Sequence, residues 1–378
     1  EVRPLDTGFM VFNHRTYPHF TELLRELEVE SRETSMSFSV QCETGGLEYN
    51  GSSLNSLFAQ RRNLLRPSFH RMIRDILRFN RESVSLLDSD APLLTLAEYL
   101  ARNRYSREFV QHYLLPMGAA IWSAEPRALQ KMPAQFFIRF FDNHGLLSLR
   151  DRPVWRVIPG GSASYVRKLV SAHRGRIRLN CPVRSVTRSG SKVFVRSGDD
   201  TVEAFDGIFI ASHSNQALRM LTDPSRAELE VLGAIPYQSN EAVLHTDTSL
   251  MPKTKRAWAA WNYRVAADQS SPMSVTYHLN RLQGLECRQQ YFVTLNSGQD
   301  IRPESIIRRI AYAHPVFHAE SIAAQGRHAE INGVNRTWYC GAYWRNGFHE
   351  DGVASAMLAL EDFDRRMRNA ELHFQRAS

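Results

Sequence analysis

A segment near the C-terminus has residue types and spacing that suit the binding of an anionic group. Residues 337–356 read as a strand that ends at Gly341, a loop that contains Gly347, and a helix that begins near Glu350. The first N–H groups of a helix lack acceptors within the helix and carry partial positive charge, so such a terminus favours anions. An ordinary helix cap would share this pattern. Small residues on the first turns would also let a flat, bulky group lie close: Gly352, Ala354, Ser355 and Ala356.

Two further parts of the chain support this interpretation. Residues 154–169 contain a Pro-Gly-Gly turn, with Gly160 and Gly161, that leads into an amphipathic helix. Residues 177–186 read as a strand that contains Pro182 and Val183, and residues 192–196 read as a second strand in which apolar and polar residues alternate. Residues 205–212 then read as a buried strand that reaches a turn before another helix.

These segments, in this order, resemble the FAD-dependent amine oxidase superfamily, which includes flavin amine oxidases, protoporphyrinogen oxidases and phytoene-type desaturases. The resemblance covers about residues 150–356, and the whole chain is similar to a bacterial branch of FAD-dependent amine oxidoreductases and NAD/FAD-binding proteins. It implies non-covalently bound FAD, with the C-terminal helix start beside the pyrimidine edge of the isoalloxazine and the Pro-Val strand at the adenine. The implied cofactor contacts here are Val183, Gly341, Gly347, Phe348, His349, Glu350 and Asp351.

The first residues of the chain resemble a later part of that superfamily's first βαβ unit. There an Asp-x-Gly turn runs past the flavin ring, which adds Asp6, Gly8 and Phe9 to the implied contacts. The superfamily begins with a strand, a Gly-x-Gly-x-x-Gly turn and a helix that hold the pyrophosphate, and this fingerprint is not found in the sequence. We expect truncation, with a dinucleotide-binding unit of roughly 30 residues or more absent. The alternative is a divergent protein that has lost its cofactor.

The order of the segments predicts an α/β fold with two domains. A Rossmann-type FAD-binding domain, incomplete at its N-terminus, would carry an inserted α+β substrate domain of the amine-oxidase type. Strands at 207–211 and 337–341 should share one sheet, and a capping box at Thr95 and Glu98 should begin a helix. The FAD-binding domain is assigned residues 1–16, 154–222 and 331–372, and the substrate domain is assigned residues 17–153 and 223–330.

The resemblance implies that a hydride passes from a substrate C–H to flavin N5, which needs no side-chain base. The sequence identifies no catalytic residue. Tyr343 and Trp344 lie on the loop between the flavin strand and the flavin helix, and we expect both, together with Trp261, to line a substrate pocket. The alternative is that these aromatic residues pack in a hydrophobic core.

Two departures from the superfamily leave the substrate open. Many amine oxidases place an acidic residue where Tyr343 stands, and many carry a lysine on the strand that matches residues 239–245, which contain none. The substrate is therefore an amine or a lipid-like molecule. Flavin-dependent desaturation of a lipid or isoprenoid is the alternative, and a non-catalytic remnant or interaction protein on a flavoprotein frame is a third.

Composition and charge favour a small-molecule enzyme in the cytoplasm. A net charge of +8 over 378 residues is modest and does not indicate nucleic acid. The four cysteines show no paired metal-ligand spacing, and no apolar run is long enough for a membrane span.

Arginines crowd the segment 66–81 above an apolar stripe, with Pro67 well placed to begin a helix. We expect an ordinary surface helix that packs on the core. The alternative is peripheral contact with an anionic membrane at its inner face.

Overall fold

The computed structural model describes residues 4–8, 10–88, 94–267 and 273–377, with side chains up to residue 368. Phe9, which the sequence assigns to the cofactor site, lies outside the described residues. The chain has a mixed α/β fold, as predicted, and divides into two compact units. The larger comprises Glu1–Thr16, Leu24–Val166 and Gln238–His314, and the smaller comprises Tyr17–Leu23, Arg167–Tyr237 and Pro315–Ser378.

A seven-stranded sheet organises the larger unit, in the order β14-β10-β13-β12-β11-β3-β4. β11 pairs antiparallel with β12 and parallel with β3, so a strand from the front of the chain extends a sheet built by its second half. A smaller antiparallel ribbon has the order β1-β5-β2. The bounds of these strands are β1 (Val11–Phe12), β2 (Arg32–Glu33), β3 (Phe38–Cys42), β4 (Glu48–Asn50), β5 (Arg156–Val157), β10 (Tyr237–His245), β11 (Trp261–Val265), β12 (Ser274–His278), β13 (Phe292–Leu295) and β14 (Ile306–Pro315).

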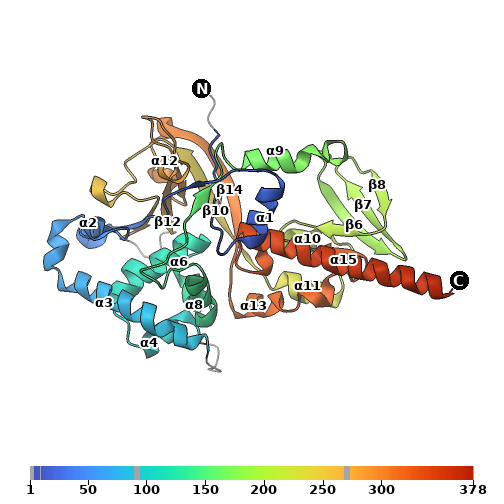
Figure 1. The fold of residues 1–378 in the computed structure, drawn as a ribbon, viewed down its shortest axis with the longest axis horizontal. Coiled ribbons are helices and arrows are strands. Elements are labelled where there is room, and N and C mark those ends of the chain that lie inside the picture. Colours follow the sequence, from blue (N-terminus) through green and yellow to red (C-terminus); the bar gives the residue numbers. More distant parts are fainter. Residues whose placement is uncertain (1–3, 9, 89–93, 268–272, 378) are drawn as a thin grey trace. The chain divides into compact units, whose positions relative to one another are not determined.

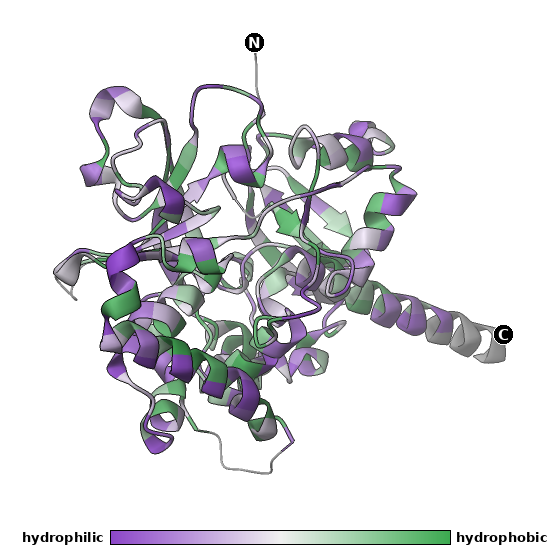
Figure 2. Cartoon of the chain, turned by 60° about the vertical axis from the view of Figure 1, so that its left-hand side comes forward, coloured by the Kyte–Doolittle hydropathy of each residue, from purple (hydrophilic) through white to green (hydrophobic). Residues whose placement is uncertain are grey.

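Short helices make up the rest of the larger unit. Figure 1 shows α2, α3, α4, α6 and α8 gathered together, with β10, β12 and β14 beside them. Figure 2 shows that hydrophilic and hydrophobic residues are mixed along the helices of the chain. Not one of the described helices is long and apolar enough to cross a membrane. Their bounds are α2 (Leu54–Leu57), α3 (Pro67–Glu82), α4 (Leu96–Arg102), α5 (Arg107–Phe109), α6 (Leu115–Trp122), α7 (Pro126–Lys131), α8 (Ala134–Asn143) and α12 (Leu279–Leu282).

Local sequence signals explain where two of these helices begin. The capping box predicted for α4 is formed: the Glu98 N–H donates to Thr95 Oγ1 at 3.2 Å, and the Thr95 N–H donates to Glu98 Oε2 at 2.8 Å. α3 begins at Pro67, as predicted. Its apolar stripe is buried in the unit, because Phe69 and Phe79 are 3% and 0% exposed. The stripe of residues 66–81 therefore packs on the core, which is the structure expected of an ordinary surface helix.

The smaller unit contains two sheets. β15 pairs in parallel with β9, from Thr337 opposite Ile208 to Tyr339 opposite Ile210, so the two predicted strands share one sheet. β6, β7 and β8 form an antiparallel meander. α15 is the long helix that ends at the C label in Figure 1. The bounds are β6 (Val183–Ser189), β7 (Lys192–Ser197), β8 (Val202–Phe205), β9 (Ile208–Ile210), β15 (Thr337–Tyr339), α10 (Ser214–Met220), α11 (Arg226–Gly233), α13 (Ala319–Gln325), α14 (His328–Ile331) and α15 (His349–Ala377).

A buried ion pair fastens α11 to the strands of the smaller unit. Arg188 on β6 donates two hydrogen bonds of 2.8 Å to the Glu228 carboxylate, which also accepts the Tyr339 hydroxyl at 2.5 Å. Burial opposes ionisation of Glu228, but the hydrogen bonds from Arg188 and Tyr339 hold its pKa below the ordinary value. Removing one partner of such a pair would leave an uncompensated buried charge.

The compact units and the predicted domains have different boundaries. Residues 1–16, assigned by sequence to the FAD-binding domain, belong to the larger unit. Two helices, α1 (Pro18–Glu26) and α9 (Ala163–Ser171), each have residues in both units. The assignment of flavin and substrate roles to these parts stays a prediction.

Candidate functional site

The loop before α15 is closed onto the helix by the helix's own side chains. Asp351 Oδ2 accepts the N–H of Asn346 at 3.1 Å and the N–H of Phe348 at 2.9 Å. One turn further, Ser355 Oγ accepts the Gly341 N–H at 2.8 Å. The helix begins at His349, one residue before the predicted start. Strand end, loop and helix start therefore form one fixed element within the smaller unit.

The helix start is electrostatically unusual because it buries acidic groups. Burial raises the pKa of Asp351 to about 6, against the lowering effect of the hydrogen bonds from Phe348 and Asn346. Burial also lowers the pKa of His349 to about 4, so its imidazole is neutral at pH 7. The imidazole of His349 thus adds no positive charge here, and the partial positive charge at this helix start is that of the backbone N–H groups.

The Glu350 side chain accepts hydrogen bonds from another helix, α1. Its carboxylate oxygens accept the N–H of His19 at 3.1 Å and the N–H of Phe20 at 2.9 Å, in the first turn of α1. The ring of Phe20 lies 5.0 Å from that of His349. Glu350 therefore caps α1, and the part of it that the structure leaves for a cofactor is its backbone. The sequence did not indicate this contact, because the two segments are more than 300 residues apart.

The glycines of this region have different roles. A Cβ at Gly341 would lie 2.5 Å from the ring of Tyr343, so this glycine makes room for the aromatic side chain. Gly347 has a φ of +95°, which favours glycine, and a Cβ there would make ordinary contacts with Phe317. Around Gly352, no described atom other than those of its chain neighbours and the helix's own backbone lies within 4 Å of a Cβ position. The space beside the first turn is open at this point.

Tyr343 and Trp344 are 3% and 6% exposed and pack in the hydrophobic core of the smaller unit, with Ile210, Leu232 and Tyr339. Gln325 fixes the loop further, because its side-chain N–H donates to the Tyr343 carbonyl at 2.8 Å. Both aromatic residues thus have the packing role that the sequence analysis gave as the alternative. Their assignment to a substrate pocket stays a prediction.

The polar groups of the smaller unit fit a flavin nucleotide. At the start of α10, Ser214 Oγ and Asn215 Oδ1 have no hydrogen-bond partner among the described residues. Phosphate and hydroxyl groups could supply such partners, and the open space at Gly352 could receive a flat ring. Val183, expected at the adenine, begins β6 and is 38% exposed. The described residues of the smaller unit therefore fit the ring and adenine parts of FAD, whereas the fingerprint that would hold its pyrophosphate is not found in the sequence.

A second candidate element, in the larger unit, joins two segments that the sequence singled out separately. The Asp6 carboxylate accepts the Ser162 N–H at 3.0 Å and the Ser162 hydroxyl at 3.2 Å, at the start of α9. Gly161 has a φ of +81°, and a Cβ there would lie 3.1 Å from Asp6 Oδ1. The predicted Asp-x-Gly turn is thus fastened to the predicted Pro-Gly-Gly turn. At Gly8, no described atom lies within 4 Å of a Cβ position.

Trp261 begins β11 in the larger unit and is 8% exposed. Its ring meets that of Tyr277 edge to face at 5.1 Å. Its indole nitrogen has no hydrogen-bond partner among the described residues. Tyr263 follows two positions later and faces the same side of the sheet, because side chains alternate along a strand.

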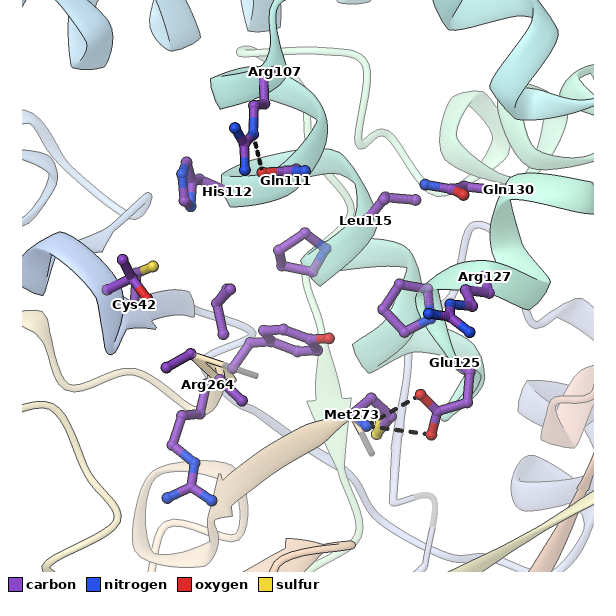
Figure 3. Close-up of a pocket in the computed structure, with 17 residues that line it drawn as sticks. Cys42, Arg107, Gln111, His112, Leu115, Glu125, Arg127, Gln130, Arg264 and Met273 are labelled. Carbon is purple, nitrogen blue, oxygen red and sulfur yellow. Dashed lines mark hydrogen bonds between the residues drawn. The ribbon is translucent and has the colours of Figure 1, made fainter. Parts of the chain in front are cut away.

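A cavity of about 690 Å³ lies in the larger unit, and sequence reasoning did not find it. Figure 3 shows its walls, which come from β3, the helical segment 107–130 and β11. Only the fold brings these segments together, so no local pattern could have revealed the cavity. Within the described residues, no group of three histidine, cysteine or acidic side chains is placed to hold a metal ion. The lining residues are Cys42, Thr44, Arg107, Gln111, His112, Leu115, Pro116, Glu125, Pro126, Arg127, Gln130, Tyr263, Arg264, Val265, Ala266, Ala267 and Met273.

Comparison with known proteins places these elements in a family. Residues 3–276 match the family described as flavin containing amine oxidoreductase. None of the curated protein sequences compared with the chain matches it.

Solved structures share the fold at low sequence identity. A putative protoporphyrinogen oxidase from Exiguobacterium sp. 255-15 is 14% identical with a TM-score of 0.67, over 96% of this chain and 90% of that one. The CLA-producing fatty acid isomerase from P. acnes is 13% identical with a TM-score of 0.64, over 94% and 86% of the two chains. Cyclohexylamine oxidase from Brevibacterium oxydans IH-35A is 14% identical with a TM-score of 0.59, over 94% and 88%.

Proposed function

The chain belongs to the family of flavin-containing amine oxidoreductases and is an FAD-dependent oxidoreductase, and we propose that it oxidises a C–H bond of a small molecule. The bond lies beside an amine or in a lipid-like carbon chain. Bound FAD would supply the hydride acceptor at N5. The observation that carries the proposal is the start of α15, where a fixed loop, a helix N-terminus and the open space at Gly352 occur together.

The role proposed for the start of α15 is to hold the pyrimidine edge of the ring. Backbone N–H groups of His349, Glu350 and Asp351 stand at the positive end of the helix, where they favour negative charge. Such preorganised donors stabilise developing charge without a protonated side chain. The neutral His349 imidazole agrees with this role, because its pKa of about 4 leaves the backbone as the source of positive potential.

The Asp6–Gly8 turn has a positioning role in this proposal. The Asp6 carboxylate is occupied by Ser162, and the Asp6 N–H donates to Gln283 Oε1 at 3.0 Å. Both contacts hold the backbone, and the space at Gly8 leaves one side of the turn open. Asp6 therefore supports the turn through its neighbours, and it carries no proton in the proposed chemistry.

The substrate class stays open between an amine and a lipid-like molecule. Tyr343 occupies the position where many amine oxidases carry an acid, and β10 contains no lysine. Solved structures of the same fold include one named as an amine oxidase and one named as a fatty acid isomerase. Desaturation of a lipid or isoprenoid is the second candidate, and the missing lysine favours it.

From the sequence, residues 66–81 are the segment that could contact a membrane, but the apolar side chains Phe69 and Phe79 of that segment are buried. We also propose a cytoplasmic protein that contacts an anionic membrane, and we assign the contact to the segment just before α3. Leu54, Leu64 and Leu65 are 77%, 49% and 88% exposed, beside the exposed Arg61 and Arg62. Exposed apolar and basic side chains together suit an acidic lipid surface.

Vesicle sedimentation tests this contact. Binding to vesicles with anionic lipid should exceed binding to neutral vesicles. Changing Leu64 and Leu65 together to serine should reduce it about tenfold or more, by removing the apolar part of the contact. Equal binding of the variant would refute the contact.

The central experiment measures flavin content and flavin reduction. Two proteins are compared: the chain as printed and the product of the longest reading frame that contains it. The longer product should be yellow and should release FAD on denaturation. Under anaerobic conditions, its flavin should bleach with members of a panel of amines, fatty acyl lipids and isoprenoids. If both proteins stay colourless after FAD is added, the proposed function is wrong and a non-catalytic role gains support.

A further inference from the structure

We infer that the cavity of the larger unit binds an amphiphilic anion, with its acidic head at Arg107 and its apolar part along the floor of the cavity. The volume of about 690 Å³ lies within the range of roughly 300–1,000 Å³ typical of small-molecule sites. The cavity is built within one unit, so the inference stands independently of the flavin chemistry proposed above.

The floor of the cavity is apolar and buried. Leu115 and Met273 are 5% and 2% exposed, and Tyr263 between the helices and the sheet is 4% exposed. Burial, and then the charge of Glu125, raise the pKa of Tyr263, so its ring is neutral at ordinary pH. Proline and alanine side chains complete this surface. It can remove the hydrocarbon part of a ligand from water.

Polar groups gather at the end formed by α5 and the π-helical turn after it. Arg107 Nε donates to Gln111 Oε1 at 2.7 Å, a contact with a neutral amide, and no carboxylate of the described residues forms an ion pair with its guanidinium. His112 is beside it in Figure 3, and its Nδ1 has no hydrogen-bond partner among the described residues. Burial lowers the pKa of His112, so the ring is neutral and can donate one N–H to an acid. Thr44 adds a hydroxyl.

A neighbouring hollow strengthens the positive character of this end. A second cavity of about 200 Å³ shares Thr44 and His112 with the first and is lined by Arg66 as well. The acid at its edge, Glu108, is paired with Arg71 at 2.6 Å. Arg66 and Arg107 thus lie near the wall that the two cavities share. The Glu108 carboxylate beside them is already paired with Arg71.

The opposite end of the cavity carries charged side chains of both signs. Arg127 lies beside Glu125 in Figure 3, and Glu125 accepts the Met273 N–H at 3.2 Å. Arg264 is also compensated, because it pairs with Asp300 and lies 3.6 Å from Glu43. Since an anion at this end would meet the Glu125 carboxylate, the geometry points to Arg107 as the head-group residue. Arg127 then serves as a control within the same cavity.

Calorimetric titration of the purified protein, incubated with FAD beforehand, tests the inference. The probes are dodecanoate, dodecanol and dodecylamine, which share a chain length and differ in head group. Dodecanoate should bind about tenfold more tightly than dodecanol, since a charge-assisted hydrogen bond to arginine is worth that factor or more. Arg107→Gln should remove this advantage and Arg107→Lys should keep most of it. Arg127→Gln should change affinity by less than about threefold.

A second variant tests the apolar part. Ala266 lines the cavity, and Ala266→Phe should fill it and weaken both dodecanoate and dodecanol. Equal affinity for the three probes, or a larger loss with Arg127→Gln than with Arg107→Gln, would overturn the inference. A yellow protein that prefers dodecylamine would also overturn it while supporting amine oxidation. A colourless protein that prefers dodecanoate would support the inference and contradict the proposed function.

Discussion

Two helices of this protein have an aspartate carboxylate that accepts backbone N–H groups at the helix start, and the two caps are built differently. α9 is capped by Asp6, which comes from the front of the chain and accepts the Ser162 N–H at 3.0 Å. α15 is capped by Asp351, which belongs to the helix itself and accepts the Phe348 N–H at 2.9 Å. The first contact fastens together segments 156 residues apart, whereas the second closes a local loop.

Because the two carboxylates differ in burial, pH and substitution should change the stability of the protein differently at the two caps. Asp351 is 5% exposed and lies next to Glu350, which is 8% exposed, so two carboxylates are withdrawn from water at one helix start. Asp6 is only part-buried. Burial raises the pKa of a carboxyl group, so the ionisation of a buried acid lowers the stability of the fold. The α15 start is therefore strained in a pH-dependent way.

The largest expected effect concerns this strain. The folded pKa of Asp351, about 6, is above its ordinary value of 3.8, so the protonated form favours folding. Stability from this group is present below about pH 4 and is lost as the pH rises through 6. Asp351→Asn removes the titration while keeping an acceptor oxygen. Between pH 4 and pH 7 the variant should gain roughly 3 kcal/mol relative to the parent protein.

Denaturant unfolding at several pH values measures this gain. Asp206→Asn is the control, because Asp206 is an exposed carboxylate paired with Lys192, and it should change stability by less than about 0.5 kcal/mol. A pH profile of Asp351→Asn that runs parallel to that of the parent protein would contradict the buried-acid interpretation.

The next effect compares the glycines of the two elements. Gly341→Ala places a Cβ 2.5 Å from the Tyr343 ring and should destabilise the protein by about 2 kcal/mol through overpacking. Gly8→Ala meets no described atom within 4 Å, and its stability should change by less than about 0.5 kcal/mol. Thermal unfolding compares the two variants. A loss at Gly8 as large as that at Gly341 would show that the Asp6 turn is tightly packed.

The sequence predicts the local parts of these elements better than the distant ones. The α4 capping box and the Pro67 start of α3 depend on residues within one turn, so their patterns are visible in the chain. The parallel pairing of β9 and β15 follows from the order of segments in a recognised fold. The Asp6–Ser162 contact and the Glu350–Phe20 contact depend on the tertiary arrangement, and no spacing in the sequence encodes them.

The two candidate sites also differ in how far the sequence predicts them, because one is a local segment and the other depends on the tertiary arrangement. The α15 loop is one continuous segment, so the sequence could place it, but the sequence left open whether Tyr343 and Trp344 belong to the core, as they do in the structure. The cavity of the larger unit draws its charged and apolar walls from separated segments. In the sequence, nothing distinguishes Arg107 from Arg127. The fold shows that Arg127 has an acidic neighbour in the cavity, Glu125.

A smaller change in stability is expected when the Asp6 carboxylate, which caps α9, is removed. Asp6→Ala removes the acceptor for the Ser162 N–H and hydroxyl and should destabilise the protein by about 1 kcal/mol, as expected for a helix N-cap. Asp6→Asn should recover most of this loss, because an amide oxygen still accepts. Chemical denaturation checks the pair. If the alanine variant is as stable as the parent protein, the contact at α9 is not a cap in solution.

The smallest change in stability gives the sharpest test of the flavin site. Gly352 lies within α15, and no described atom other than those of its chain neighbours and the helix's own backbone is within 4 Å of its Cβ position. Gly352→Ala should therefore stabilise the helix by about 0.5–1 kcal/mol. The same methyl group would enter the space proposed for the flat ring, so flavin content measured by absorbance should fall. Stability and flavin content then change in opposite directions, which a purely structural role of Gly352 does not explain. A variant that is more stable and keeps its full flavin content would show that the ring lies elsewhere.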